Sequence, residues 1–300
     1  RMTRWIMIIG TVVSCIFLTS GEAQARLKVA SLHPLITDVA RQVAGQKAMV
    51  VQVIDPHADP HEFQPTPKAL LRAKGATLYL ASGKNLENYL TKLRSTLGGG
   101  VKVIEVGRTI PSLRLSARDS QFVCCPAHAH GSIDPHWWHK VSNMQKAARV
   151  IAKEFATADP ANAASYKANA AAYSKRLAVL HSWIKREVSK IPRSKRILAT
   201  AHAAFGYFCK EYGFKALPIK GLSSHQKTSA SYQAQAINLV KKHKVSAIFP
   251  EQRANSKLLQ SVAKETRTKI GGTLIADGSP SYEKMMRNNV KAIVTGLNGK

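Results

Sequence analysis

The sequence predicts an α/β protein in which two lobes are joined by one long helix. Short apolar runs alternate with segments of helical spacing over residues 27–106, and the same alternation returns over residues 196–297. Strands that alternate with helices form parallel βαβ units. Residues 141–190, between the two regions, have a helical pattern. Because 45% of the 300 residues are hydrophobic, the chain can bury a core, which excludes wholesale disorder.

The first 25 residues are predicted to be a secretory signal peptide. Arg1 and Arg4 form a charged start, residues 5–18 are mostly apolar, and residues 23–25 form a small-x-small cleavage site. The apolar run is too short to span a bilayer comfortably. Cys15 lies in a lipobox-like sequence, but the apolar run continues past it. We therefore expect a periplasmic protein, with lipid anchoring at Cys15 as the less favoured alternative.

The N-terminal lobe is predicted to span residues 26–141 and to contain four strands. The strands are expected at residues 27–31, 49–54, 77–81 and 101–106, and the helices at residues 35–43, from residue 67 and at residues 86–97. Thr66 is a good helix N-cap, and Pro67 suits the first helical position. Residues 107–135 then form a long loop, which in a compact domain is usually functional or disordered.

Residues 142–192 are predicted to form the linking helices. Asp159 and Pro160 divide this region, and apolar residues then recur at three- and four-residue steps. These are Tyr166, Ala170, Tyr173, Leu177, Leu180, Ile184 and Val188. The stripe fits a helix of about 28 residues, about 40 Å long, which could bridge two lobes or be an ordinary core helix.

The C-terminal lobe is predicted to span residues 193–300 and to repeat the strand–helix alternation. Strands are expected at residues 196–200, 216–219, 245–250 and 272–276, and helices at residues 203–212, 231–243, 256–266 and 282–297. Each lobe would therefore contribute four strands.

Candidate functional residues follow the predicted strands. His61, His136, His202 and Asp277 each come after a strand, two in each lobe. In parallel sheets, ligands bind beyond the carboxyl ends of the strands. A lone histidine is commonly an ordinary polar residue, but four such residues at equivalent positions are hard to obtain by chance.

Three motifs resemble the zinc and manganese solute-binding proteins of bacterial ABC transporters. They are His61-Glu-Phe-Gln-Pro-Thr-Pro67 after Asp59-Pro60, Asp134-Pro-His136-x-Trp138, and Ala201-His202-x-x-Phe205-x-Tyr207. The resemblance extends over the whole mature chain. It implies a metal receptor that delivers its ion to a membrane permease, with two four-stranded parallel lobes and a rigid linking helix. The ligands it implies here are His61, His136, His202 and Asp277.

The departures from the family pattern bear on the metal. The family usually has Leu-Asp-Pro after Asp-Pro-His-x-Trp, where this chain has His139-Lys-Val141. Manganese-type members have Glu at the position of His202, and zinc-type members often have a longer His- and acid-rich loop than the segment with His128 and His130. Imidazole suits Zn²⁺, whereas Mn²⁺ prefers more oxygen ligands. Three imidazoles and one carboxylate can close a tetrahedral zinc shell, so Zn²⁺ is favoured over Mn²⁺.

Four further side chains are candidates for auxiliary roles. His57 repeats the local pattern of His61, but a solvated loop histidine is the common case. His128 and His130 could capture the ion or could be incidental loop residues. Glu251 follows the predicted strand at residues 245–250 and could orient the ring of a ligand histidine, or it could pair with a nearby basic residue such as Arg253.

A secreted zinc hydrolase is the alternative function. Three histidines with an open coordination position would activate water. The sequence contains no H-E-x-x-H motif, and Asp277 would fill the fourth position, so a receptor is favoured over an enzyme.

The net charge of +28 raises nucleic acid or an anionic surface as a partner. The basic residues are spread along the chain without interleaved aromatic residues, so we expect solvated helix faces, no nucleic-acid partner and a monomer. Cys124, Cys125 and Cys209 are an odd number in an oxidising compartment. One disulfide between Cys209 and one of the adjacent pair is expected, although the spacing does not decide which.

Overall fold

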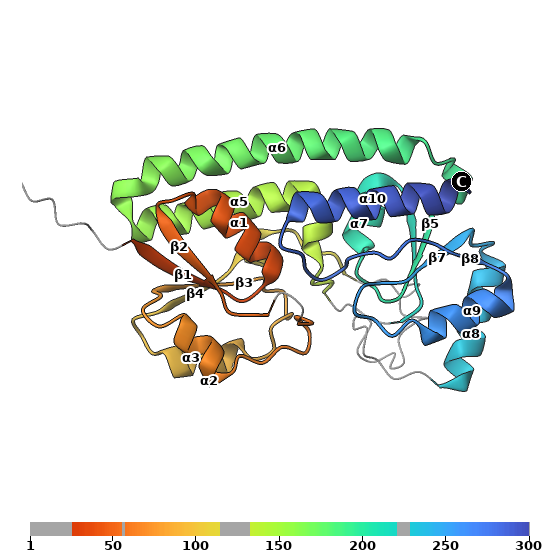
Figure 1. Ribbon diagram of the computed structural model, residues 1–300, viewed down its shortest axis with the longest axis horizontal. Coiled ribbons are helices and arrows are strands. Elements are labelled where there is room, and N and C mark those ends of the chain that lie inside the picture. Colours follow the sequence, from red (N-terminus) through yellow and green to blue (C-terminus); the bar gives the residue numbers. More distant parts are fainter. Residues whose placement is uncertain (1–25, 56–57, 115–132, 221–228, 300) are drawn as a thin grey trace, which may run out of the picture.

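Two separate sheets form the two lobes of the protein (Figure 1). The computed structural model describes residues 26–55, 58–114, 133–220 and 229–299. The N-terminal sheet contains β1 (Leu27–Ser31), β2 (Ala48–Gln52), β3 (Leu78–Ala81) and β4 (Lys102–Glu105), in the order β2-β1-β3-β4. The C-terminal sheet contains β5 (Ile197–Thr200), β6 (Lys215–Pro218), β7 (Ala247–Phe249) and β8 (Lys269–Ile270), in the order β6-β5-β7-β8. All neighbouring strands are parallel, which confirms the predicted fold class.

Helices flank both sheets. In the N-terminal lobe they are α1 (Pro34–Ala44), α2 (Pro67–Arg72) and α3 (Leu90–Leu97); in the C-terminal lobe they are α7 (Gly206–Tyr212), α8 (Ala230–Lys242), α9 (Lys257–Thr266) and α10 (Tyr282–Asn298). The predicted start of α2 is confirmed, because the Thr66 hydroxyl accepts the Ala69 N–H at 3.2 Å and Pro67 is the first helical residue. No helix among the described residues is long and apolar enough to cross a membrane.

The long helix α6 (Ala163–Ser189) bridges the two lobes. It follows α5 (Val141–Ala158) and a short 3-10 turn over Pro160–Asn162. All seven residues of the predicted apolar stripe are buried on α6. This face packs against α5 and α1 on one side and against α10 on the other, and Figure 1 shows the helix extending over both lobes. The bridging interpretation is therefore confirmed, and the shared core resists independent movement of the two ends of α6.

Three elements differ from the sequence-based expectation, because glycine or hydrogen bonds change the local chain path. The predicted strand at residues 272–276 is wrong, since β8 is Lys269–Ile270 and only Leu274 makes a bridge, to Glu251. The ring of Phe249 lies 2.5 Å from where a Cβ on Gly271 would be, and glycine weakens a strand. The predicted helix at residues 86–97 starts only at Leu90, because the Glu87 carboxylate accepts two backbone N–H groups and stabilises a turn.

The helix predicted at residues 203–212 begins at Gly206 instead. The residues before it form a turn in which the His202 carbonyl accepts the Thr200 hydroxyl at 2.9 Å and the Ala204 N–H at 2.9 Å. These two bonds occupy the His202 carbonyl. A helix that started at residue 203 would need this carbonyl as an acceptor for the N–H group four residues further on. The turn also determines the position of His202 at the end of β5.

Candidate metal centre

Four side chains from four different loops converge between the lobes. His61 lies in the turn between β2 and α2, and His136 lies just before the 3-10 turn Trp137–His139 that leads to α5. His202 follows β5, and Asp277 lies between β8 and α10. Their donor atoms all lie within 4.8 Å of one another. The structure thus brings together the four residues that the sequence singles out.

The distances between these donor atoms resemble the edges of a small tetrahedron. The Nε2 atom of His136 is 3.0 Å from that of His61 and 3.3 Å from that of His202. The Asp277 carboxylate oxygens lie 3.7 Å from His61 Nε2, 3.4 Å from His136 Nε2 and 3.7 Å from His202 Nε2. Zinc bonds of 2.0–2.1 Å in a tetrahedral shell imply edges of about 3.3 Å. The five distances lie within about 0.4 Å of this edge, with Oδ1 of Asp277 facing His61 and His136 and Oδ2 facing His202, so the arrangement suits a tetrahedral ion.

A buried carboxylate orients His136. Asp134 Oδ1 lies 2.8 Å from His136 Nδ1 and also accepts the His136 backbone N–H at 2.9 Å. Both side chains are fully buried. With a carboxylate as acceptor, Nδ1 carries the proton and Nε2 is left to face the centre of the group.

A second carboxylate does the same for His202. Glu251, which follows β7, contacts His202 Nδ1 through one oxygen and accepts the His202 backbone N–H at 3.0 Å through the other. Both side chains are almost completely buried. The two most deeply buried imidazoles therefore share one arrangement: a carboxylate on Nδ1 and a free Nε2 directed at Asp277.

The segment that carries Asp277 is held from both lobes. Leu274 pairs with Glu251 of the C-terminal lobe. On the other side the Ala276 carbonyl accepts Trp138 Nε1–H at 2.8 Å and His139 Nε2–H at 2.9 Å. In the structure both side chains hold the backbone next to Asp277.

The metal-free electrostatics separate two kinds of histidine. Burial lowers the pKa of His136 and of His202, but the neighbouring carboxylates, including Asp277, outweigh burial and raise each pKa above 6.5. Burial raises the pKa of Asp277, but the histidines outweigh it and hold that pKa well below 3.8. By contrast, burial lowers the pKa of His139 to about 3. His139 is therefore neutral and serves as a hydrogen-bond donor.

His33 is a neutral hydrogen-bonding residue. Its Nδ1 accepts the Leu35 N–H at 3.2 Å and caps α1. Burial lowers the pKa of His33 to about 3. The Trp138 ring lies between His33 and His136, with centroids 4.6 and 5.3 Å away, so the deep wall of the site is apolar.

The site is open on one side only. His136 and His202 have no exposed side-chain surface, whereas His61 and Asp277 retain 12% and 13% exposure. Asp277 Oδ1 is buried and has no hydrogen-bond partner among the described residues. An unsatisfied buried carboxylate oxygen beside three imidazole nitrogens is what a bound divalent cation would satisfy.

Several candidate residues fall outside the described part of the chain. They are His57, His128, His130, Cys15, Cys124 and Cys125. Cys209 is buried in α7, and both of its expected disulfide partners are in this group. The auxiliary roles and the disulfide therefore stay predictions.

Comparison with known proteins places this geometry in a family. The sequence pattern of the family described as "Zinc-uptake complex component A periplasmic" (ZnuA) matches residues 29–296. The chain belongs to this family. The family resemblance proposed from the three motifs is therefore confirmed.

Relatives of this ZnuA-family protein differ in their metals. It is 29% identical over 286 residues to the manganese-binding lipoprotein MntA of Halalkalibacterium halodurans, covering 93% of this chain and 91% of that one. It is 28% identical over 284 residues to the iron-binding protein YfeA of Yersinia pestis, covering 92% and 88%.

Solved structures share the fold of this ZnuA-family protein over nearly its whole length. The periplasmic zinc-binding protein TroA of Treponema pallidum matches with a TM-score of 0.80 and 25% identity, covering 91% of this chain and 99% of that one. A manganese-bound periplasmic metal-binding protein of Candidatus Liberibacter asiaticus matches with a TM-score of 0.79 and 27% identity, covering 91% and 100%.

Sequence reasoning missed the roles of Asp134 and His139 in the ZnuA-family site. Asp134 stands two residues before His136 in the motif, and this spacing could have indicated the hydrogen bond to Nδ1. His139 gives no such signal, because its partner, the Ala276 carbonyl, is 137 residues away. Contacts across that separation become visible only in the folded chain.

Replacing Glu251 by glutamine should weaken Zn²⁺ binding by about 10–100-fold, the usual cost of losing a carboxylate that orients a metal-ligating histidine. A glutamine amide has one acceptor oxygen, so it cannot accept both the Nδ1 proton and the backbone N–H of His202 as the carboxylate does, and the imidazole loses basicity and orientation. A competitive titration with a zinc chelator would measure the change, and the surface variant Glu154→Gln, which breaks only the ion pair with Lys102, is the matched control. Equal affinities in the two variants would contradict an orienting role for Glu251.

Proposed function

We propose that this protein is an extracytoplasmic receptor that binds Zn²⁺ through His61, His136, His202 and Asp277 and delivers the ion to the membrane permease of an ABC transporter. The observation that carries the proposal is the near-tetrahedral arrangement of three Nε2 atoms and one carboxylate. Membership of the zinc-uptake family supports the transport role. The zinc-binding TroA, which shares the fold, supports the choice of metal.

Mn²⁺ is the competing cargo, because MntA and the Liberibacter protein are described with manganese. The donor set argues for zinc, since it offers three nitrogens and only one carboxylate, whereas Mn²⁺ prefers oxygen ligands. Metal analysis of protein purified without chelator, followed by competition between Zn²⁺ and Mn²⁺, tests the choice. Preferential retention of Mn²⁺ at equal free concentrations would overturn the assignment of zinc.

The hydrolase alternative gains no support. A catalytic zinc keeps one position for water, but here Asp277 stands in the fourth position. Two of the three imidazoles are fully buried, and the exposed side of the group is narrow. The arrangement suits retention and transfer of an ion better than access for a substrate.

Replacing Asp277 by asparagine should weaken Zn²⁺ binding less than replacing His202 by alanine, and it should open one coordination position. The amide is a poorer ligand, but three imidazoles still hold zinc, with water as a fourth ligand. Chelator competition would compare the two affinities, and X-ray absorption would count the light-atom neighbours of the metal. If Asp277→Asn changes neither quantity, Asp277 is not a ligand.

Several relatives are named as lipoproteins, including MntA of Bacillus subtilis and SloC of Streptococcus mutans. These names favour lipid attachment at Cys15 over the unanchored form preferred in the sequence analysis. We therefore propose an extracytoplasmic protein anchored at Cys15. Mass spectrometry of the mature N-terminus decides between a lipidated Cys15 and an unmodified residue 26.

A further inference from the structure

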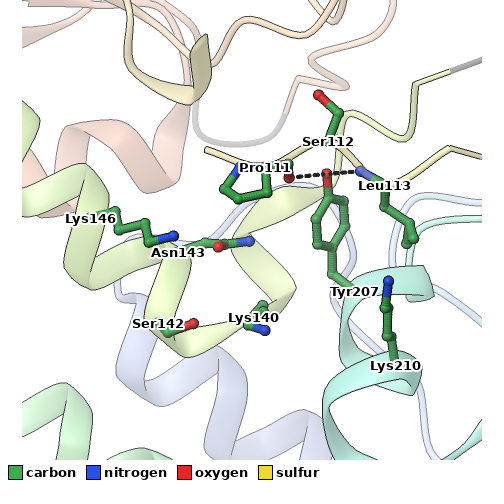
Figure 2. A pocket seen from close by; sticks show the side chains of 9 residues that line it. All are labelled: Pro111, Ser112, Leu113, Lys140, Ser142, Asn143, Lys146, Tyr207 and Lys210. Carbon is green, nitrogen blue, oxygen red and sulfur yellow. Dashed lines mark hydrogen bonds between the residues drawn. The ribbon is translucent and has the colours of Figure 1, made fainter. Parts of the chain in front are cut away.

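A second cavity lies between the linking helices and the C-terminal lobe, apart from the metal-ligand group. Its volume is about 160 Å³, and α5, α7 and the segment at residues 111–113 line it (Figure 2). Since a water molecule occupies about 30 Å³ in the liquid, the space accommodates a ligand of several heavy atoms. The Tyr207 hydroxyl closes one wall, donating to the Pro111 carbonyl at 3.2 Å and accepting the Leu113 N–H at 2.8 Å.

Three lysines surround this cavity, which we call the lysine pocket. Lys140 and Lys146 come from the start of α5, and Lys210 comes from α7. Lys140 pairs with Glu211 at 2.6 Å. Within the described ranges Lys146 and Lys210 make no hydrogen bond or ion pair. The two ammonium groups have no counter-ion among the described residues, so they repel each other across the pocket. An anion bound between them would attract both.

A further ammonium group lies beside the lysine pocket and contacts Ser112. Lys84 is only 9% exposed, and its Nζ donates to the Ile110 carbonyl and to the Ser112 hydroxyl, each at 2.7 Å. Figure 2 shows the Ser112 oxygen directed away from Lys146 and Lys210, so the contact between Lys84 and Ser112 contributes positive charge beside the pocket and not a hydroxyl donor within it. Burial of this charge beside neutral oxygens lowers the pKa of Lys84. A nearby anion would stabilise the charged form.

The helix that borders the lysine pocket adds to the positive potential. Ser142 belongs to the first turn of the 18-residue helix α5, which has no acidic residue in that turn and no side-chain cap. The N-terminus of a helix carries a partial positive charge and favours anions. Here Lys140 stands at the N-cap position instead, which adds a like charge where an anion would be stabilising.

We propose that the lysine pocket binds a phosphate-sized oxyanion. The proposal combines a cavity of suitable volume, two unpaired ammonium groups from different elements, the buried charge of Lys84 beside the pocket and the start of α5. Lysine binds phosphate as a point charge, so the site needs no planar guanidinium. A bound oxyanion would tie α5 to α7 and so join the linking helices to the C-terminal lobe.

The test is titration with inorganic phosphate at constant ionic strength, followed by calorimetry and ³¹P NMR. Wild-type protein should bind phosphate saturably with one-to-one stoichiometry. The double variant Lys146→Gln/Lys210→Gln should bind at least about tenfold more weakly, because each lost charge-assisted hydrogen bond costs roughly a factor of ten or more. The control Lys185→Gln/Lys241→Gln removes the same charge from exposed positions on α6 and α8 and should keep wild-type affinity.

Three outcomes would overturn the proposal: no saturable binding, equal weakening in both double variants, or loss of phosphate binding in His136→Ala, which would place the anion at the metal centre. Circular dichroism and thermal unfolding report the fold, and the single variant Lys210→Gln at an exposed position serves if the double variant is unstable.

Vesicles of phosphatidylcholine with and without phosphatidic acid distinguish the source of the phosphate group. Vesicle binding that the same two substitutions abolish assigns a lipid headgroup, and binding of inorganic phosphate alone assigns a free anion.

Discussion

Replacing His136 by alanine should lower the affinity for Zn²⁺ by more than about a hundredfold. His136 Nε2 lies 3.0, 3.3 and 3.4 Å from the donor atoms of His61, His202 and Asp277, so it contacts all three other members of the group. Loss of a group that merely orients a ligand costs about 10–100-fold, and loss of a ligand from a four-membered shell costs more. Chelator competition against wild-type protein would measure the affinity.

This variant needs a check on folding, because it leaves the Asp134 carboxylate buried without its imidazole partner. His61→Ala avoids that problem, since His61 is partly exposed and leaves no buried carboxylate without its partner, and it should also lose most of its zinc affinity. His243→Ala, at the end of α8 and far from the site, is the matched control and should bind normally. Wild-type affinity in both His136→Ala and His61→Ala would mean that the ion binds elsewhere.

Zinc affinity should fall steeply as the pH decreases, and the fall should begin above pH 6.5. The metal-free protein holds the pKa of both His136 and His202 above 6.5, because their carboxylate neighbours outweigh the effect of burial. Each of these imidazoles must therefore release a proton when zinc binds. Below both pKa values, affinity should decrease about tenfold per pH unit for each proton released, whereas Asp277, with its lowered pKa, stays ionised and contributes no such loss.

The measurement is chelator competition between about pH 5 and pH 8, the range in which imidazole changes charge, combined with calorimetry in buffers of different ionisation enthalpy. The calorimetry counts the protons released and separates histidine titration from loss of the fold. Glu251→Gln offers an internal control, because removing a carboxylate from His202 should lower the pKa of that histidine and shift the loss of affinity to lower pH. Affinity that stays constant over the whole range would contradict a site made of three imidazoles.

The four proposed metal ligands come from both lobes. His61 and His136 belong to the N-terminal lobe and the start of the linking helices, and His202 belongs to the C-terminal lobe with Glu251. Asp277 is attached to both, because Leu274 pairs with Glu251 while Trp138 and His139 hold the Ala276 carbonyl. A bound ion would add one more link at the same place.

Local patterns in the amino-acid sequence determine much of this protein by themselves. The strand predicted at residues 27–31 matches β1, and the seven-residue stripe matches the buried face of α6. Both could be predicted because strands and amphipathic helices are recognised from the spacing of apolar residues that are close together in the sequence. Parallel strands present their carboxyl ends at one edge of their sheet, which explains why His61, after β2, and His202, after β5, each lie at the carboxyl edge of their own sheet. Packing of the two lobes then brings these edges together.

Only the tertiary structure decided which groups hold those histidines in place. The glycines at 271 and 272 end β8 early, so packing of the loop against Trp138 and His139, and not a strand, places Asp277. Glu251 reaches His202 across 49 residues, and the sequence left it equally open to pairing with a basic residue. Such pairings depend on long-range packing, which satisfies buried polar groups with whichever partner the fold brings near. The spacing of apolar residues within one segment therefore does not indicate which distant residue a buried polar group will contact.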